Sequence, residues 1–147
     1  MTTDTTTSYH LELPGELIRF RIESFGYLHT GGAAPEAADL VLDVRHALKD
    51  PHVAPELRQL TGRDAAVRAN VLRQPGAGDL VAGVVATALA LRPSADARSM
   101  LVHVAIGCQG GRHRSVVLAT EVAARLFAAG FGVHVQHSHL DRPVVAR

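Results

Sequence analysis

The chain has 147 residues, of which 47% are hydrophobic and 20% are charged. This length fits one domain with a sizeable hydrophobic core and fits two only with difficulty. The composition is that of a globular protein and excludes collagen and an intrinsically disordered chain. No stretch approaches the roughly 20 consecutive apolar residues of a membrane-spanning helix, so we expect no membrane partner.

The charges are nearly balanced, but the basic residues are almost all arginine. The formal net charge is +1, which excludes a strong overall field toward nucleic acid or anionic lipid. Lys49 is the only lysine. Two explanations of this bias stay open. One is codon usage, and the other is recognition of phosphate or carboxylate by planar guanidinium groups. Composition alone does not decide between them. Cys108 is the only cysteine, which suits a reducing cytosol and predicts a cytoplasmic location.

The strands are predicted from apolar patterning, taken in chain order. Residues 1–14 begin with a polar, threonine-rich run and are expected to form a flexible tail. Alternating or continuous apolar runs predict strands at 17–25, 39–45, 99–106 and 132–138. Residues 141–147 are expected to form a second tail.

Helical patterns occupy residues 63–73, 79–91 and 113–129. We expect the helix at 79–91 to be capped by Asp79 and to end before Pro93, because proline removes a backbone donor. This helix is apolar nearly all round, so we expect it to be heavily buried.

The order of these elements predicts the fold class. Strand–helix–strand units favour parallel pairing, with the helices on the faces of the sheet. We therefore predict one α/β domain over residues 15–140, with three layers, a mostly parallel central sheet and helices on its faces.

The most informative segment is the glycine-rich loop that follows the strand at 99–106. A buried strand that ends in glycines and leads at once into a helix places free backbone N–H groups at the carboxyl edge of the sheet. The positive end of the helix dipole lies there too, and anions bind at such edges. Phosphate is the ligand that best suits such a site, because it has several acceptor oxygens and more than one negative charge. The candidate binding residues follow one another along the chain: Gly110, Gly111, Arg112, His113, Arg114 and Ser115. The alternative is a tight turn without a ligand.

The same loop matches a second pattern. Cys108, five intervening residues, Arg114 and Ser115 spell C-x5-R-S, which resembles the phosphate-binding loop of cysteine-dependent phosphatases. Cys108 would then be the nucleophile, and Arg114 would hold the oxyanions. However, Gly107 stands where histidine is usual, and no general-acid aspartate can be located. We therefore favour a small buried residue for Cys108 and expect no catalysis.

Further candidates lie outside this loop. Asp43 and Arg45 lie at the end of the predicted strand 39–45, so they are expected at the same sheet edge as the glycine loop. Asp43 is either the partner of a loop arginine or a simple capping carboxylate. His52 follows Pro51 in a fixed turn and is either a donor to phosphate or a solvated side chain.

Three histidines near the carboxyl end invite a metal site. On a strand, His137 and His139 share one face while His134 points to the other. No carboxylate completes a ligand set, so we expect neither zinc nor another cofactor.

Beyond single motifs, a series of segments resembles one known family. These segments are Ile22–Gly26, Ala38–Arg45, Pro51-His52, Leu57-Arg58, Leu60–Gly62 with Asp64, Ala105–Cys108, Gly110-Gly111, His113–Val116 and His137–Leu140. Their order and approximate spacing are kept from about Arg21 to Leu140. Over this range the chain resembles the carboxyl-terminal domain of the RNase adapter protein RapZ.

The resemblance implies a regulatory role. Full-length family members join this domain to a P-loop kinase-like domain, and no G-x4-G-K-[ST] motif occurs here, so we expect a stand-alone domain. In the family, the domain senses glucosamine-6-phosphate, binds small regulatory RNA for a ribonuclease and assembles into homo-oligomers. The implied sugar-phosphate pocket uses Gly110, Gly111, His113, Arg114, Ser115 and His52, with Asp43 and Arg45 nearby. Gln109 stands where the family commonly has threonine.

Together these observations predict a non-catalytic sensor domain. It would hold a phosphorylated small molecule, either an amino-sugar phosphate or a nucleotide, at the glycine loop, and we expect a dimer or larger homo-oligomer. Two alternatives stay open. An RNA-binding adapter predicts a contiguous arginine patch, and a cysteine-dependent phosphatase predicts turnover that depends on Cys108.

Overall fold

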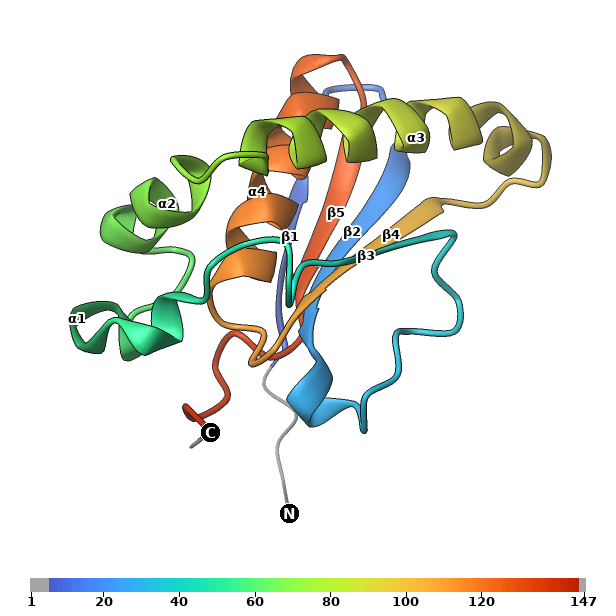
Figure 1. Cartoon of the computed structure of the whole chain (residues 1–147). Coiled ribbons are helices and arrows are strands. Elements are labelled where there is room, and N and C mark those ends of the chain that lie inside the picture. The colour runs from blue at the N-terminus through green and yellow to red at the C-terminus, as the bar shows by residue number, and fades with distance from the viewer. Residues whose placement is uncertain (1–5, 146–147) are drawn as a thin grey trace.

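The computed structural model describes residues 6–145 and contains a five-stranded sheet (Figure 1). The strands are β1 (Thr7–Leu11), β2 (Ile18–Gly26), β3 (Leu40–Asp43), β4 (Val102–Cys108) and β5 (Gly132–His137). The helices are the 3-10 helices η1 (Tyr27–His29) and η2 (Pro51–Val53), then α1 (Pro55–Arg58), α2 (Ala65–Leu72), α3 (Ala77–Ala97) and α4 (Arg114–Ala128). The strand order in the sheet is β1-β5-β2-β4-β3.

The pairing of the strands follows from their connections. Helix α3 joins β3 to β4, and α4 joins β4 to β5, so each of these strands starts from the same edge of the sheet. Strand β2 pairs in parallel with both β4 and β5, while β1 pairs with β5 in the antiparallel sense. The carboxyl ends of β2, β3 and β4 therefore meet at one edge. The predicted α/β fold with a mostly parallel central sheet is confirmed.

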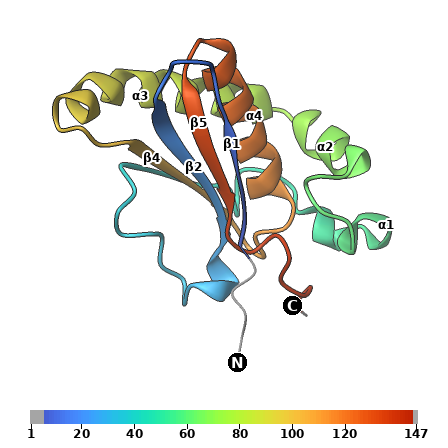
Figure 2. The ribbon, with the colours of Figure 1, turned by 180° about the vertical axis from the view of Figure 1, so that it is seen from behind.

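The two faces of the sheet are covered differently. Phe20, Ile22 and Val104 belong to the main core and are fully buried. Helices α3 and α4 lie against this face, with the sheet in front of them when the molecule is seen from behind (Figure 2). On the opposite face, Phe25 packs against Ala34 in a smaller apolar cluster. The segment after β2 therefore forms the third layer.

The amino-terminal segment corrects one prediction. Residues 1–14 were expected to be a flexible tail, but residues 7–11 form the edge strand β1. Strand β1 exposes most of its side chains and adds Leu11 to the core, so its apolar signal in the sequence is weak. Residues 1–5 of the predicted tail lie outside the described residues, as do residues 146–147 of the second tail.

Helix α3 corrects a second prediction. It starts after Gly76, whose φ of +89° suits glycine, so Asp79 is not its cap, and it continues through Pro93 to Ala97. Asp96 pairs with Arg19 of β2 and with Arg92 one turn earlier. The pair with Arg19 connects the last turn of α3 to the sheet, and the pair with Arg92 lies within the helix.

The burial of α3 also differs from the expectation. Val81, Val84 and Ala88 pack into the core, but much of the helix surface is exposed. By length and composition alone α3 is long and apolar enough to cross a membrane, and 22% of its most apolar 18-residue stretch is buried in this fold. The core helices of other proteins also meet this criterion, so a single such helix is weak evidence for a membrane span.

Candidate functional site

The loop between β4 and α4 packs tightly against the end of β2. A Cβ atom at Gly26 would lie 2.4 Å from the backbone carbon of Gly110 and 2.6 Å from the nitrogen of Gly111. Gly111 itself has a φ of +74°, a conformation that favours glycine. The backbone N–H of Gly26 donates to His139 Nδ1 at 2.8 Å. The loop is therefore held between β2 and the residues after β5.

Backbone donors at this edge are available for an anion. Within the part of the chain that the structure describes, the N–H groups of Gln109, Gly110 and Arg112 donate no hydrogen bond to another group. Helix α4 starts directly after them, and no side chain caps its first turn. Unpaired amides together with a helix N-terminus favour binding of a phosphate or carboxylate. These N–H groups are therefore the candidate donors for the anion site that the glycine pattern predicts.

The side chain of Arg114 makes contacts inside the protein. Its side chain is only 2% exposed, and its Nη1 donates to the carbonyl oxygens of Val44, Arg45 and Leu48 at 2.8–3.2 Å. Its Nη2 lies 3.1 Å from Asp50 Oδ2. The guanidinium group therefore joins α4 to the segment after β3. The sequence suggested that Arg114 binds the ligand directly, and in the structure its guanidinium group also makes these internal contacts.

Arg112 is also used internally. Its Nη1 donates to the carbonyl oxygens of Leu140 and Arg142, and its Nη2 donates to that of Gln59. These bonds tie the loop to the carboxyl-terminal segment. The contribution of Arg112 to an anion site is thus its backbone N–H.

Asp43 and Arg45 lie at the predicted edge. Asp43 stands opposite Gly107 in the β3–β4 pairing, next to the loop. Arg45 Nη2 lies 2.7 Å from Asp43 Oδ2, and its guanidinium carbon lies 3.7 Å from the centre of the Tyr27 ring. The bonds from Arg45 lower the pKa of Asp43. Asp43 Oδ1 also accepts the backbone N–H of Arg45 at 2.9 Å, as a capping carboxylate does, and among residues 6–145 its side-chain partner is Arg45 and not an arginine of the loop.

His52 is placed by a chain of contacts that includes Arg114. The carboxylate of Asp50 accepts a hydrogen bond from the backbone N–H of His52 at 2.9 Å, and the same carboxylate pairs with Arg114. His52 itself is partly buried in η2. The imidazole of His113, just before α4, is buried.

Cys108 and Ser115 form a buried pair. The sulfur lies 3.1 Å from Ser115 Oγ and accepts from the N–H of Gly111 at 3.3 Å. Only 2% of Cys108 is exposed. Its burial and its contacts with Ser115 and Gly111 favour the structural role for Cys108 over the nucleophile.

Sequence reasoning missed residues that shape the site. Gly26, Asp50 and His139 position the loop, and Gly62 donates its N–H to the carbonyl of Arg112 at 2.7 Å. A Cβ atom at Gly62 would lie 2.8 Å from the carbonyl oxygen of His113. Glycines at the end of a strand and before a helix were the available signal, but their partners lie far away in the sequence.

Residues 6–145 contain no cluster of three or more His, Cys, Asp or Glu side chains placed to hold a metal ion. The histidines near the carboxyl end have separate surroundings. His139 accepts from Gly26, whereas His137 is 1% exposed and its Nδ1 lies 2.7 Å from Ser24 Oγ.

The buried position of His137 predicts a pH-dependent stability. Burial, reinforced by the positive charge of Arg63 and opposed by Asp141, lowers the pKa of His137 from 6.5 to about 4. The unfolded chain therefore binds a proton that the folded chain does not bind between these pH values. The stability that neutral His137 contributes is complete above pH 6.5 and is lost as the pH falls to about 4.

We expect this histidine to account for a fall of about 3 kcal/mol in the free energy of unfolding across that pH window. The variant His137→Gln should lose this part of the pH dependence, and urea unfolding at both ends of the window measures it. The exposed His46→Gln serves as the matched control. A His137→Gln protein with the wild-type pH dependence would contradict this assignment.

Comparison with known proteins shows which family the chain belongs to. The family model described as the RapZ C-terminal domain matches residues 18–141. A nucleotide-binding protein of Frankia alni is 45% identical over 123 residues, which cover 82% of this chain and 41% of the relative. One of Thermobifida fusca is 42% identical over 127 residues, with 85% and 42% covered. One of Paramagnetospirillum magneticum is 37% identical over 142 residues, with 87% and 46% covered.

The chain spans less than half the length of these curated relatives. The matched range contains the end of β3, the turn at His52 and the whole loop before α4. The chain belongs to the RapZ C-terminal domain family.

Proposed function

We propose that the chain is a non-catalytic regulatory domain that binds a phosphorylated small molecule, a nucleotide or an amino-sugar phosphate, at the loop before α4. The observation that carries this proposal is the set of unpaired N–H groups of Gln109, Gly110 and Arg112 beside the uncapped start of α4. The backbone of Gly110 and Gly111 packs against Gly26, which holds this part of the loop in place, and backbone N–H groups in such turns bind phosphate oxygens.

Two further points support a phosphorylated ligand. The relatives from Frankia alni and Thermobifida fusca are called nucleotide-binding proteins. Those names describe chains more than twice as long as the matched region. The resemblance to the RapZ domain adds glucosamine-6-phosphate as a candidate. Both ligand classes carry the phosphate group that the loop suits.

An RNA adapter role would require arginines free to contact several phosphates. Near the loop, Arg112 and Arg114 donate to backbone carbonyls, and Arg45 is paired with Asp43. These three arginines therefore form no contiguous patch for RNA, and we prefer the small-molecule function.

The proposal is tested by titrating the ¹⁵N-labelled protein with glucosamine-6-phosphate, AMP and unphosphorylated glucosamine. We expect a phosphorylated compound to shift the amide resonances of Gln109, Gly110 and Arg112, because their N–H groups gain an acceptor. Glucosamine should leave them unchanged. His52→Ala should weaken binding about tenfold, as expected for one lost hydrogen bond to a charged group.

His46 is exposed and lies, like His52, between β3 and α1. The variant His46→Ala is therefore the matched control and should bind as the wild type does. If no phosphorylated compound moves the three amide resonances, the function assigned to this loop is wrong.

A further inference from the structure

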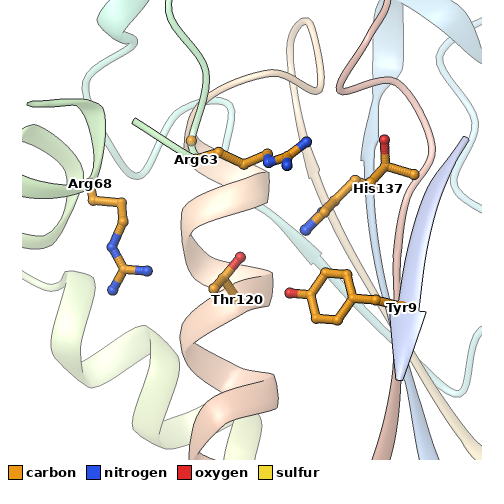
Figure 3. Close-up of a pocket in the computed structure, with 7 residues that line it drawn as sticks. Tyr9, Arg63, Arg68, Thr120 and His137 are labelled. Atoms are coloured by element: carbon orange, nitrogen blue, oxygen red, sulfur yellow. The ribbon is translucent and has the colours of Figure 1, made fainter. Parts of the chain in front are cut away.

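A cavity lies away from the loop, on the helix-covered face of the sheet. It has a volume of about 340 Å³, which is within the range of small-molecule sites. Figure 3 shows Arg63, Arg68 and Thr120 on one side and Tyr9 and His137 on the other. These residues come from the loop before α2, from α2, α4, β1 and β5. None of them belongs to the loop that carries the proposed function.

The charges around this cavity leave one cation without a partner. Arg68 is paired with Glu121 of α4, and the carboxylate of Asp141 accepts a hydrogen bond from Thr7 at 2.6 Å. Across residues 6–145, the guanidinium group of Arg63 makes neither an ion pair nor a hydrogen bond. Its end points toward His137 (Figure 3). Arg63 is therefore the group that an incoming anion would pair with.

The remaining walls supply hydrogen bonds and apolar surface. Thr120 donates its hydroxyl hydrogen to the carbonyl of Val116 at 2.7 Å, so its oxygen is left as an acceptor. The Tyr9 ring lies 6.1 Å from the His137 ring, and Tyr9 is 38% exposed. In Figure 3 the Tyr9 hydroxyl points toward Thr120, and a ring nitrogen of His137 points into the same space. The rings of Tyr9 and His137 and the hydroxyl groups of Tyr9 and Thr120 thus line the same cavity as the unpaired guanidinium group of Arg63.

We infer that this cavity binds a small molecule that carries an oxyanion, a phosphate or a carboxylate, with the oxyanion on Arg63 and the body of the molecule between Tyr9 and Thr120. The guanidinium fork matches the geometry of both oxyanions. His137, buried at the back of the cavity, adds a neutral ring nitrogen. The site is separate from the phosphate site at the loop before α4 and goes beyond the proposed function.

The inference is tested with three probes of similar size: phenyl phosphate, benzoate and phenol. Resonances of Tyr9, Thr120 and His137 in the ¹⁵N-labelled protein report on the cavity, and those of Gln109 and Gly110 report on the loop. We expect at least one anionic probe to shift the cavity resonances, whereas uncharged phenol should not. The response to phenyl phosphate compared with benzoate identifies the preferred oxyanion.

The decisive variant is Arg63→Gln, whose side chain is exposed and whose fold is expected to be unchanged. It should weaken binding of the anionic probe in the cavity at least about tenfold. Arg73→Gln, at the other end of α2, should bind as the wild type does. The inference is overturned if neither anion shifts the cavity resonances, or if Arg63→Gln binds the probe as tightly as the wild type.

Discussion

Replacing Arg114 by alanine should lower the free energy of unfolding by about 3–5 kcal/mol, the range for breaking a buried ion pair. The side chain is 2% exposed and lies 3.1 Å from Asp50. Its removal also leaves the carbonyl groups of Val44, Arg45 and Leu48 without their donor. Urea unfolding followed by circular dichroism measures the loss.

Two further variants show how far the internal bonds of Arg114 account for this loss of stability. Arg114→Lys retains a positive charge near Asp50 but cannot reach several carbonyls with a planar fork, so it should lose less stability than Arg114→Ala. The exposed Arg73→Ala should change stability by no more than about 0.5 kcal/mol. If Arg114→Ala were as stable as Arg73→Ala, the internal bonds of Arg114 would not stabilise the fold.

Gly26→Ala should both destabilise the protein and impair the loop. The new methyl group would lie 2.4 Å from the backbone of Gly110, and a backbone atom cannot move aside as the end of a side chain can. We expect a loss of about 1–3 kcal/mol, the usual cost of overpacking a well-packed region. The displaced loop should also lose affinity for the phosphorylated ligand, which calorimetry measures.

Gly83→Ala is the matched control for this glycine. Gly83 lies inside α3, and a Cβ atom there meets nothing within 4 Å. Because alanine is the better helix former, this variant should gain about 0.5–1 kcal/mol. Equal effects of the two substitutions would show that the contact between Gly26 and Gly110 is not tight in solution.

Local patterns predicted the elements of the core and failed where the pattern was weak. Strands β2 and β4 and helix α4 start and end within a few residues of their predicted bounds, because their apolar periodicity comes from burial against one another. Strand β1 was missed since it is mostly exposed at the edge of the sheet. Helix α3 was expected to end before Pro93 but runs through it, and Asp96 in its last turn pairs with Arg19, a residue 77 positions earlier.

At the candidate site, the sequence predicted where the glycine-rich loop lies, but not which internal contacts its side chains make. Gly110 and Gly111 lie at the expected sheet edge, and Asp43 lies beside them. Arg114, which the sequence assigned to the ligand, donates to backbone carbonyls of the segment after β3. The candidate donors that the structure adds are backbone N–H groups, which every residue except proline has whatever its side chain.

The sequence by itself thus determined the fold class, the family and the position of the glycine loop, because these depend on residue types close together in the chain. Only the tertiary structure decided which cations are already paired. Arg114 meets carbonyl groups nearly 70 residues earlier in the chain, whereas the guanidinium group of Arg63 meets none among residues 6–145. The tertiary structure also brought Tyr9 and His137 together across β1 and β5. Such partners are set by the register of strands and the packing of helices, which no local spacing encodes.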